Sequence, residues 1–389
     1  MIRRTSGARP ARRLLVAGAA VAALSLSLAA CSSDAGASDA GSSSGGDIAL
    51  GYTATLTGDF ASYGLEMREG VDLAVEQINA AGGIDGRQVT IVSADDEGSP
   101  ANGPVVAQQF CDDSSIAAVL GYSFSSVALA ALPVYDQCGL PVVASAVTSP
   151  ELTGASSVFF RDVFTDAYQG AAMGEHVYDG GTKKVAVLYQ QDDYGQGVSE
   201  AFSTAFEEAG GTVTSSQAYQ LGTVDFATLI NTALADSPDG VFIGGFYTEA
   251  AKIATQLRSS GSDLPIYGTD GAVSPDLVSL GGDSVEGMTV YSAFSAAAGT
   301  PAATDFVAAF NEKFDKDPSS WAALAYDATN VVAQAITDAG STDRADVATA
   351  LAAIDGFAGV TGDISFDDGG DRLGELVFLK VDGGAFVAE

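Results

Sequence analysis

The stretch AAVLGYSFSSVALAALPVYDQCGLPVVASAVTS, residues 117–149, decides the fold. It begins with the apolar run Ala117–Gly121, continues with the helical segment Ser126–Gln137 and ends in a second apolar run, Pro141–Ala144. Neither run alternates between apolar and polar residues, which is typical of strands covered on both faces in a parallel sheet. A strand, a helix and a strand in this order predict one unit of a doubly wound α/β fold.

The same alternation continues on both sides of this stretch. Further strands are expected at short apolar runs, namely Ile48–Tyr52, Val89–Ser93, Val185–Tyr189, Val213–Ala218, Val241–Gly245 and Pro265–Tyr267. Helices are expected between them, at Gly64–Ala81, Pro104–Asp112, Asp166–Asp179, Gly195–Ala209, Phe226–Ala235 and Thr248–Ser259. The last third predicts helices at Ala303–Asp315, Ser320–Ala339 and Ala345–Ala352 and strands at Asp363–Phe366, Leu376–Val381 and Ala385–Val387. The length from Asp47 onward exceeds one ordinary core and predicts two lobes.

The N-terminus has the order of an export signal. Five arginines up to Arg13 precede the apolar run Leu14–Ala30, which ends in small residues before Cys31. We therefore expect a signal peptide over residues 1–30, by either the general or the twin-arginine route. A buried first helix or a membrane anchor is the alternative, but a spanning helix needs about 20 apolar residues and no terminal cysteine.

The cysteine that follows the small residues resembles a bacterial lipobox, in which Cys31 would be lipidated and become the first mature residue. Residues 31–46 are almost entirely Ser, Ala, Gly and Asp after that cysteine, which predicts a flexible tether. We expect an extracytoplasmic protein anchored to the membrane by lipid.

The charge of the mature chain excludes a class of partners. Five of the 17 basic residues precede Cys31 and all 50 acidic residues follow it, so 12 basic against 50 acidic side chains remain, a net charge of −38. Nucleic acid binding requires a basic face, so this balance argues against it. It also argues against a polybasic membrane-binding surface. Solubility at a cell surface accounts for the acidic excess.

Two cysteines follow Cys31, namely Cys111 and Cys138. An exported protein allows a disulfide between them, and each would end a helix beside the same strand. Two buried thiols are the alternative.

Groups for catalysis are absent from the sequence. The one histidine, His176, lies within a predicted helix, where a solvated or packed side chain is the ordinary role. No Gly-x-Ser-x-Gly, phosphate-binding loop or Gly-rich dinucleotide turn is present, and no His/Cys cluster has zinc spacing. The turn Asp367–Asp371 lacks the ligand spacing of a calcium loop. We expect a protein that binds rather than catalyses, without a metal or cofactor.

Polar residues follow three predicted strands, where ligands bind in open α/β sheets. Residues 122–126 place hydroxyls and free backbone N–H groups at a helix N-terminus, which favours an anion such as a carboxylate. Residues 145–150 bring further hydroxyls, and Asp270 in residues 268–271 could pair with an ammonium group. Taken singly, each segment is better explained as a helix cap or a turn than as a ligand site. Together they describe a carboxylate pole and an ammonium pole.

At these residues the sequence resembles the leucine/isoleucine/valine-type periplasmic binding proteins, the solute receptors of amino-acid ABC importers. The matching segments span nearly the whole mature chain and include residues 58–64 (GDFASYG), 74–87 (AVEQINAAGGIDGR), 119–153, 193–197 (DYGQG), 244–247 (GGFY), 268–271 (GTDG), 325–328 (AYDA) and 364–371 (ISFDDGGD).

The resemblance implies the roles of individual residues. Ser125 and Thr148 would hold the ligand carboxylate, with Ala146 lining the site, and Asp270 would bind the ammonium group. Asp270 stands where the family often has glutamate. The resemblance also implies an aromatic wall, formed by Tyr63, Tyr194, Phe246 and Tyr326. Phe246 departs from a family tyrosine and cannot donate a hydrogen bond, and core packing is the alternative role for each aromatic residue.

The resemblance further implies the type I fold, with two doubly wound Rossmann-like lobes joined by a three-crossing hinge. Lobe one is expected at 47–165 and 294–371, and lobe two at 166–293 and 372–389. The implied function is that of a monomer that closes on an amino acid, branched-chain or aliphatic, and presents it to the permease subunits of an ABC importer. A receptor for an amide, a urea-like solute or an aromatic acid, or a ligand sensor, is the alternative.

Overall fold

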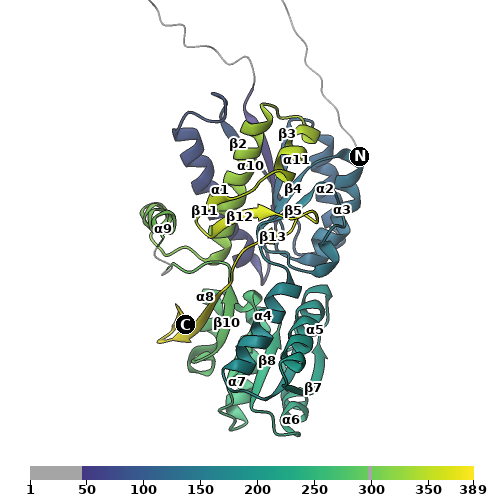
Figure 1. Ribbon diagram of the computed structural model, residues 1–389, viewed down its shortest axis with the longest axis vertical. Coiled ribbons are helices and arrows are strands. Elements are labelled where there is room, and N and C mark those ends of the chain that lie inside the picture. Colours follow the sequence, from purple (N-terminus) through teal and green to yellow (C-terminus); the bar gives the residue numbers. More distant parts are fainter. Residues whose placement is uncertain (1–45, 297–299) are drawn as a thin grey trace, which may run out of the picture. The chain divides into compact units, whose positions relative to one another are not determined.

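Two largely parallel sheets form the centres of two lobes (Figure 1). The computed structural model describes residues 46–296 and 300–389, so the predicted signal peptide, Cys31 and nearly all of the predicted tether lie outside the described residues. Among the residues described, no helix combines the length and apolar character that crossing a bilayer requires. We call the part around the five-stranded sheet lobe one and the part around the seven-stranded sheet lobe two.

Lobe one contains a fully parallel sheet of order β2-β1-β3-β4-β5. Its strands are β1 (Ile48–Ala54), β2 (Val89–Asp95), β3 (Ile116–Gly121), β4 (Val142–Ala144) and β5 (Phe159–Arg161). The helices of this part are α1 (Ala61–Ala80), α2 (Gly103–Asp112), α3 (Ser125–Cys138), α9 (Pro301–Phe314), α10 (Ser320–Ala339) and α11 (Arg344–Ala352).

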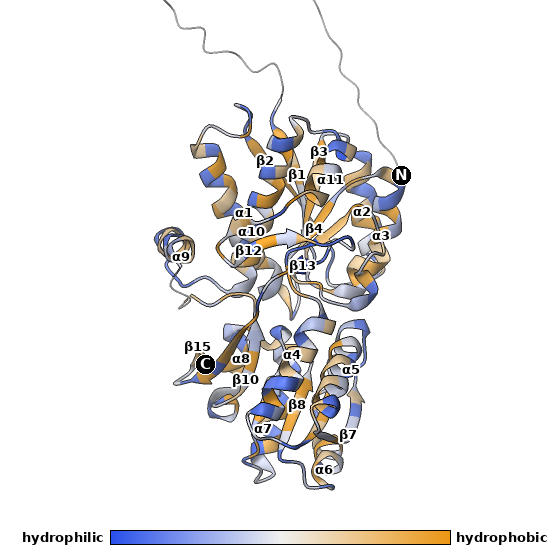
Figure 2. Ribbon diagram, in the orientation of Figure 1, coloured by the Kyte–Doolittle hydropathy of each residue, from blue (hydrophilic) through white to orange (hydrophobic). Residues whose placement is uncertain are grey.

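Helices cover both faces of this sheet, which explains why its strands are apolar without alternation. Val119 of β3 packs in a core cluster with Phe110 of α2 and Val127 of α3. The next residue, Leu120, points to the opposite face and belongs to the cluster that contains Leu324 of α10. Successive side chains of a strand point to opposite faces, so both must be apolar here. Figure 2 accordingly shows the strands of both lobes as largely hydrophobic.

Lobe two contains the sheet of order β15-β14-β10-β9-β8-β6-β7. Its strands are β6 (Lys184–Gln190), β7 (Thr212–Tyr219), β8 (Gly240–Gly244), β9 (Ile266–Gly268), β10 (Thr289–Ser292), β14 (Val377–Asp382) and β15 (Ala385–Ala388). The last two form an antiparallel hairpin. The helices are α4 (Asp166–Asp179), α5 (Asp193–Glu208), α6 (Ala227–Leu234), α7 (Tyr247–Ser259) and α8 (Pro275–Gly281). Helices α4 and α5 approach closely, since a Cβ on Gly170 would lie 2.7 Å from the Val198 carbonyl oxygen.

A third, small antiparallel sheet joins β11 (Phe357–Gly359), β12 (Gly362–Phe366) and β13 (Arg372–Leu373). Every strand and helix expected from the sequence is present, with ends that differ by up to three residues. The sequence analysis missed the short elements β5, α8, β10, β11 and β13. These elements are too short for a periodic pattern, and pairing with neighbouring strands rather than local composition stabilises the strands among them.

Cys111 and Cys138 form a disulfide in the structure, with a Cα–Cα distance of 5.8 Å. Cys111 lies in the last turn of α2 and Cys138 is the last residue of α3. The bond joins the ends of two helices that pack against the same face of the lobe-one sheet.

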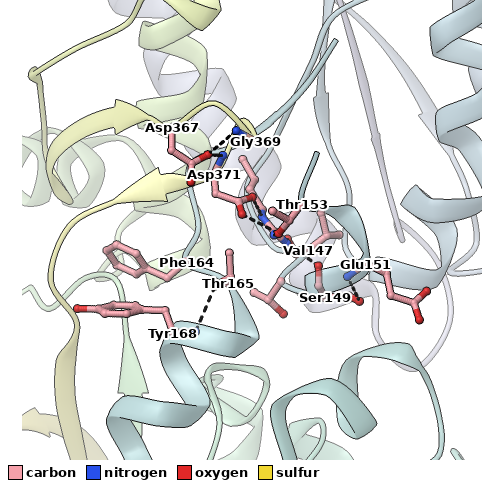
Figure 3. A network of polar contacts seen from close by, with 12 residues as sticks. Val147, Ser149, Glu151, Thr153, Phe164, Thr165, Tyr168, Asp367, Gly369 and Asp371 are labelled. Carbon is pink, nitrogen blue, oxygen red and sulfur yellow. Dashed lines mark hydrogen bonds and ion pairs between the residues drawn. The ribbon is translucent and has the colours of Figure 1, made fainter. Parts of the chain in front are cut away.

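A buried arginine joins the end of β5 to the turn before β13. Arg161, the last residue of β5, is fully buried, and its Nε lies 2.6 Å from Asp371 Oδ1. The Thr153 hydroxyl donates to the other Asp371 oxygen at 2.7 Å and accepts from Arg161 at 2.8 Å. The turn Asp367–Asp371 holds this acid in place, because Asp367 Oδ1 accepts from the backbone N–H groups of Gly369 and Asp371 (Figure 3).

A second arginine extends this tie. Arg372 donates to the Asp162 carbonyl oxygen at 2.9 Å and to the Thr361 hydroxyl and carbonyl oxygens at 2.8 Å each. Asp327 of α10 accepts from the backbone N–H groups of Val360 and Thr361. Asp371 and Arg372, around the start of β13, thus bond to Arg161 and Asp162, around the end of β5.

We expect Asp371→Asn to destabilise the fold by about 3 kcal/mol, because it leaves the buried Arg161 charge without a counterion. Urea unfolding followed by circular dichroism measures the change. Asp368→Asn is the matched control, since Asp368 is exposed in the same turn and should change stability by less than about 0.5 kcal/mol. Equal midpoints for the two variants would show that the ion pair contributes nothing.

Candidate binding site between the lobes

One small cavity lies where the C-terminal ends of the two sheets meet. Its lining comes from both lobes and consists of Tyr63, Ser123, Ser125, Ala146, Tyr194, Phe246, Asp270, Gly271 and Trp321. The enclosed volume is about 10 Å³, room for about one water molecule. The lobes are therefore in contact here, with side chains filling most of the space between them.

The lobe-one side of the cavity presents hydroxyls and a helix N-terminus. Ser125 is the first residue of α3, and its Oγ accepts from the backbone N–H groups of Thr148 and Ser149 at 3.2 Å each. The Ser123 hydroxyl accepts from the N–H of Thr55 at 3.1 Å. The loops after β3 and β4 are thus bound to each other. The Thr148 Oγ1 is buried and has no hydrogen-bond partner among the described residues.

The lobe-two side presents a carboxylate. Asp270 is 4% exposed, and its Oδ1 accepts from the Tyr194 hydroxyl at 2.7 Å and from the Gly271 N–H at 2.8 Å. Its Oδ2 accepts from Gln169 Nε2 at 3.0 Å. Burial raises the pKa of Asp270, and these hydrogen bonds oppose the increase because they favour the charged form. An anionic carboxylate can therefore be held here away from water.

Aromatic rings from both lobes form the wall of the cavity. Phe124 of lobe one meets Phe246 of lobe two edge to face, with ring centroids 4.9 Å apart. Tyr194 stacks on the other side of Phe246 at 5.0 Å, and Tyr63 meets Trp321 at 5.7 Å. Each such pair contributes about 0.5–1.5 kcal/mol beyond its buried area, and the Phe124–Phe246 pair favours contact between the lobes because it spans them.

Hydrogen bonds also cross between the lobes near the cavity. Tyr63 donates its hydroxyl to the Gly271 carbonyl oxygen. The Tyr247 hydroxyl donates to the Asp59 carbonyl oxygen at 3.0 Å. Trp321 Nε1 donates to the Val273 carbonyl oxygen at 3.0 Å. The structure is consequently a closed arrangement of the two lobes.

The sequence of this chain matches a known family. The model of a family described as periplasmic binding protein matches residues 47–385. The chain belongs to the periplasmic binding protein family. A Leu/Ile/Val-binding protein homolog of Brucella abortus is 31% identical over 344 residues, which cover 87% of this chain and 91% of that protein.

Solved structures agree with this assignment. The leucine-binding protein LivK of Thermotoga maritima superposes with a TM-score of 0.84 at 31% identity and covers 88% of this chain and 97% of its own. The isoleucine-bound LivJ of Streptococcus pneumoniae has the same TM-score at 29% identity and covers 88% of this chain and 99% of its own. The two-lobe type I fold expected from the sequence is confirmed.

The structure brings most of the residues predicted for the site together in this periplasmic binding protein. Six of them line the cavity, namely Tyr63, Ser125, Ala146, Tyr194, Phe246 and Asp270. Thr148 lies behind Ser125, to which its N–H is bonded. Tyr326 must be placed elsewhere, because its hydroxyl donates to Gln77 at 2.6 Å and its ring packs on Phe306 of α9 at 4.8 Å. It lines a separate groove beside α1 and α10, so we withdraw it from the site.

Sequence reasoning missed several residues of the cavity and its surroundings. Trp321 lies in a predicted helix, where core packing is the ordinary role of a tryptophan, yet it lines the cavity from the first turn of α10. Gln169 and Asp166 lie in the first turn of α4, where polar side chains usually face solvent, but both are buried here. The sequence could have pointed to these two residues in one way: the predicted helix Asp166–Asp179 begins where the chain passes from lobe one to lobe two, next to the expected site.

A partly buried glutamate lies at the edge of the same interface. Glu66, one turn after Tyr63 in α1, is near Ser319 and Lys316 of lobe one and Asp276 of lobe two. Burial raises the pKa of Glu66 to about 7, and the charges of Glu69 and Asp276 add to this, while Ser319 and Lys316 oppose it. The closed protein therefore holds a proton on Glu66 at mildly acidic pH.

The raised pKa of Glu66 predicts a pH dependence of stability. Between the ordinary pKa of 4.5 and about 7, the folded protein binds a proton that the unfolded chain has lost, so stability falls as the pH rises through this window. Glu66→Gln removes this loss. We expect thermal unfolding to show the variant more stable than wild type by roughly 3 kcal/mol at pH 8 and equally stable near pH 4.

Glu76→Gln is the control for this measurement, because Glu76 is exposed on the same helix and its pair with Lys313 contributes little. A constant difference between Glu66→Gln and wild type from pH 4 to pH 8 would contradict the assignment.

Proposed function

We propose that this periplasmic binding protein captures an α-amino acid with a branched-chain or aliphatic side chain and delivers it to an ABC importer. The observation that carries the proposal is the pair of opposite poles across one closed cavity, with hydroxyls and a helix N-terminus on lobe one and Asp270 on lobe two. The names of relatives support the solute class, since they include a Leu/Ile/Val-binding protein homolog and an isoleucine-bound transporter component.

The proposed carboxylate pole is the start of α3. Ser125 and the first turn of α3 follow shortly after the end of β3, and a helix N-terminus favours an anion. The Thr148 hydroxyl, buried without a partner among the described residues, supplies a further donor next to Ser125. We infer that these groups hold the ligand carboxylate.

The proposed ammonium pole is Asp270. Its oxygens are fixed by Tyr194 and Gln169, so the carboxylate is already oriented when the ligand arrives. A charge-assisted hydrogen bond to a buried carboxylate is stronger than a neutral one. The aspartate is one methylene shorter than glutamate, which places the charge deeper in lobe two.

The aromatic wall supports an aliphatic ligand side chain. Tyr63, Phe246 and Trp321 offer ring faces and edges without a charged group. An apolar side chain among them loses contact with water and gains about 25 cal/mol for each Å² that it buries. A charged side chain would lose its hydration there without a partner.

Ligand binding and lobe closure are coupled in this proposal. The two poles belong to different lobes, so a ligand can contact both only when the lobes meet, and it therefore favours the closed state. We propose that lobe one comprises 47–165 and 294–371 and lobe two 166–293 and 372–389. The membership of β10, β14 and β15 in the lobe-two sheet supports this division.

A thermal-shift screen of the chain from Asp47 to Glu389 against amino acids, amides and small aromatic acids tests the proposal. A ligand at 100 times its Kd stabilises the native state by about 2.7 kcal/mol. We expect leucine, isoleucine or valine to raise the melting temperature. A shift with amides or aromatic acids alone would replace the proposed ligand, and no shift with any of them would contradict the proposed function.

The same screen on Asp270→Ala locates the ligand. Loss of the carboxylate should abolish the shift with zwitterionic amino acids and spare that with any uncharged amide, because only the ammonium group requires Asp270. Leucine binding that survives this change would place the ammonium pole elsewhere.

We also propose that the protein is an extracytoplasmic monomer held to the membrane by a lipid on Cys31. The order of basic, apolar and small residues before Cys31 and the export of proteins of this family support this. More than one acyl chain on a lipoprotein gives stable attachment. Fractionation of cells that express the full chain should place it in the membrane pellet, and Cys31→Ser in the soluble fraction. Both proteins in the same fraction would contradict anchoring through this cysteine.

A further inference from the structure

Asp166, the first residue of α4, is a buried acid without a partner. Its side chain is 0% exposed, and neither carboxylate oxygen has a hydrogen-bond partner among the described residues. A buried carboxylate is normally paired or hydrogen-bonded, since the desolvation of an isolated charge is costly. The surroundings of Asp166 indicate what kind of partner it would take.

Asp166 lies near enough to Asp270 for their charges to interact. Gln169 is three residues further along α4, so it shares a helix face with Asp166, and it donates to Asp270 Oδ2 at 3.0 Å. Burial raises the pKa of Asp166, and the charge of Asp270 raises it further. The Tyr194 hydroxyl is bonded to Asp270 and lies within the electrostatic reach of both acids. Two carboxylates therefore lie close together on one side of the site.

Asp166 also adjoins the opposite pole. Its backbone N–H donates to the Thr148 carbonyl oxygen at 2.8 Å, and the Thr148 hydroxyl lies close enough to favour the charged form of Asp166 without completing a hydrogen bond. Asp166 is thus bonded to Thr148 through its backbone and interacts electrostatically with Asp270. An α-amino acid carries its carboxylate and its ammonium group on one carbon atom, so the groups that bind them must also be neighbours.

Among the described residues, the cation that interacts with this acid already has other partners. Arg161 is near Asp166, but its Nε pairs with Asp371 and its remaining nitrogens donate to Thr153 and to the carbonyl oxygens of Val147 and Ser149. Asp192, the other charged neighbour, has the same sign as Asp166 and caps α5 through the N–H of Gly195. A partner of positive charge has to come from the ligand.

We propose that Asp166 is a second ammonium-binding acid, which acts with Asp270 on the same ligand amine. The inference rests on the proposed function, because it requires a ligand with a protonated amino group. Two acids around one ammonium group make the site selective for amines over isosteric neutral groups. Two carboxylates also repel one another when no cation lies between them. The ligand ammonium group offsets this repulsion and thereby favours closure of the lobes.

Isothermal titration of Asp166→Asn with leucine and with 2-hydroxy-4-methylpentanoate tests the proposal. The second compound replaces the ammonium group of leucine by a neutral hydroxyl. Asparagine keeps the size of the side chain and removes the charge, so we expect leucine affinity to fall about 10- to 100-fold. Affinity for the hydroxy acid should stay within about threefold of wild type or increase.

Asp162→Asn is the matched control. Asp162 is also fully buried with two unpartnered carboxylate oxygens, but its charged neighbours are Arg372 and Asp327 instead of Asp270. Its leucine affinity should equal that of wild type. The proposal is overturned if Asp166→Asn binds leucine as wild type does, or if it weakens leucine and the hydroxy acid equally, as a structural role would.

The two proposals fail in different ways. If the wild-type protein binds neither leucine nor any other amine, the proposed function fails and the role of Asp166 fails with it. If the wild-type protein binds leucine and Asp166→Asn binds it equally well, only the role of Asp166 fails.

Discussion

The site depends on the buried ion pair between Arg161 and Asp371. Arg161 ends the last strand of lobe one, and its NH1 group donates to the carbonyl oxygens of Val147 and Ser149. These two residues flank Thr148, so the guanidinium fixes the loop that carries one pole. The chain continues from Arg161 into α4, whose first turn carries Asp166 and Gln169. One cation thus positions parts of both poles, and Asp371 compensates its charge in an interior that could not hold it alone.

The parts of the fold that follow from local pattern were predictable. Residues 117–149 show a strand, a helix and a strand through their composition alone, because a parallel strand covered on both faces must be apolar throughout. Short elements such as β10, with four residues, carry no such pattern. They exist because a neighbouring strand provides hydrogen-bond partners, and that information is spread over distant parts of the sequence.

The site divides along the same line. Ser125 and Asp270 follow predicted strands, so their position at the edge of a sheet could be inferred from strand order. Tyr326 lies on a helix, where the direction of a side chain depends on the elements that pack against each face. Here Tyr326 contacts α1 and α9 and does not reach the cavity. Trp321 is five residues earlier on α10 and reaches the cavity instead. Packing between the helices of lobe one decides the direction of both side chains, and the spacing of residues along the sequence does not reveal that packing.

The arginine ties have a mechanical consequence for the opening of the lobes. Arg161–Asp371 and Arg372–Asp162 join the first and third connecting segments side by side. Two segments joined in this way resist sliding past each other and rotate together as a single hinge. Opening should therefore be a rotation about the line through these residues, and the aromatic residues between the lobes, which lie away from this line, should move the farthest. Lobe movement then has one direction, which is the property a receptor needs in order to present the same face each time it closes.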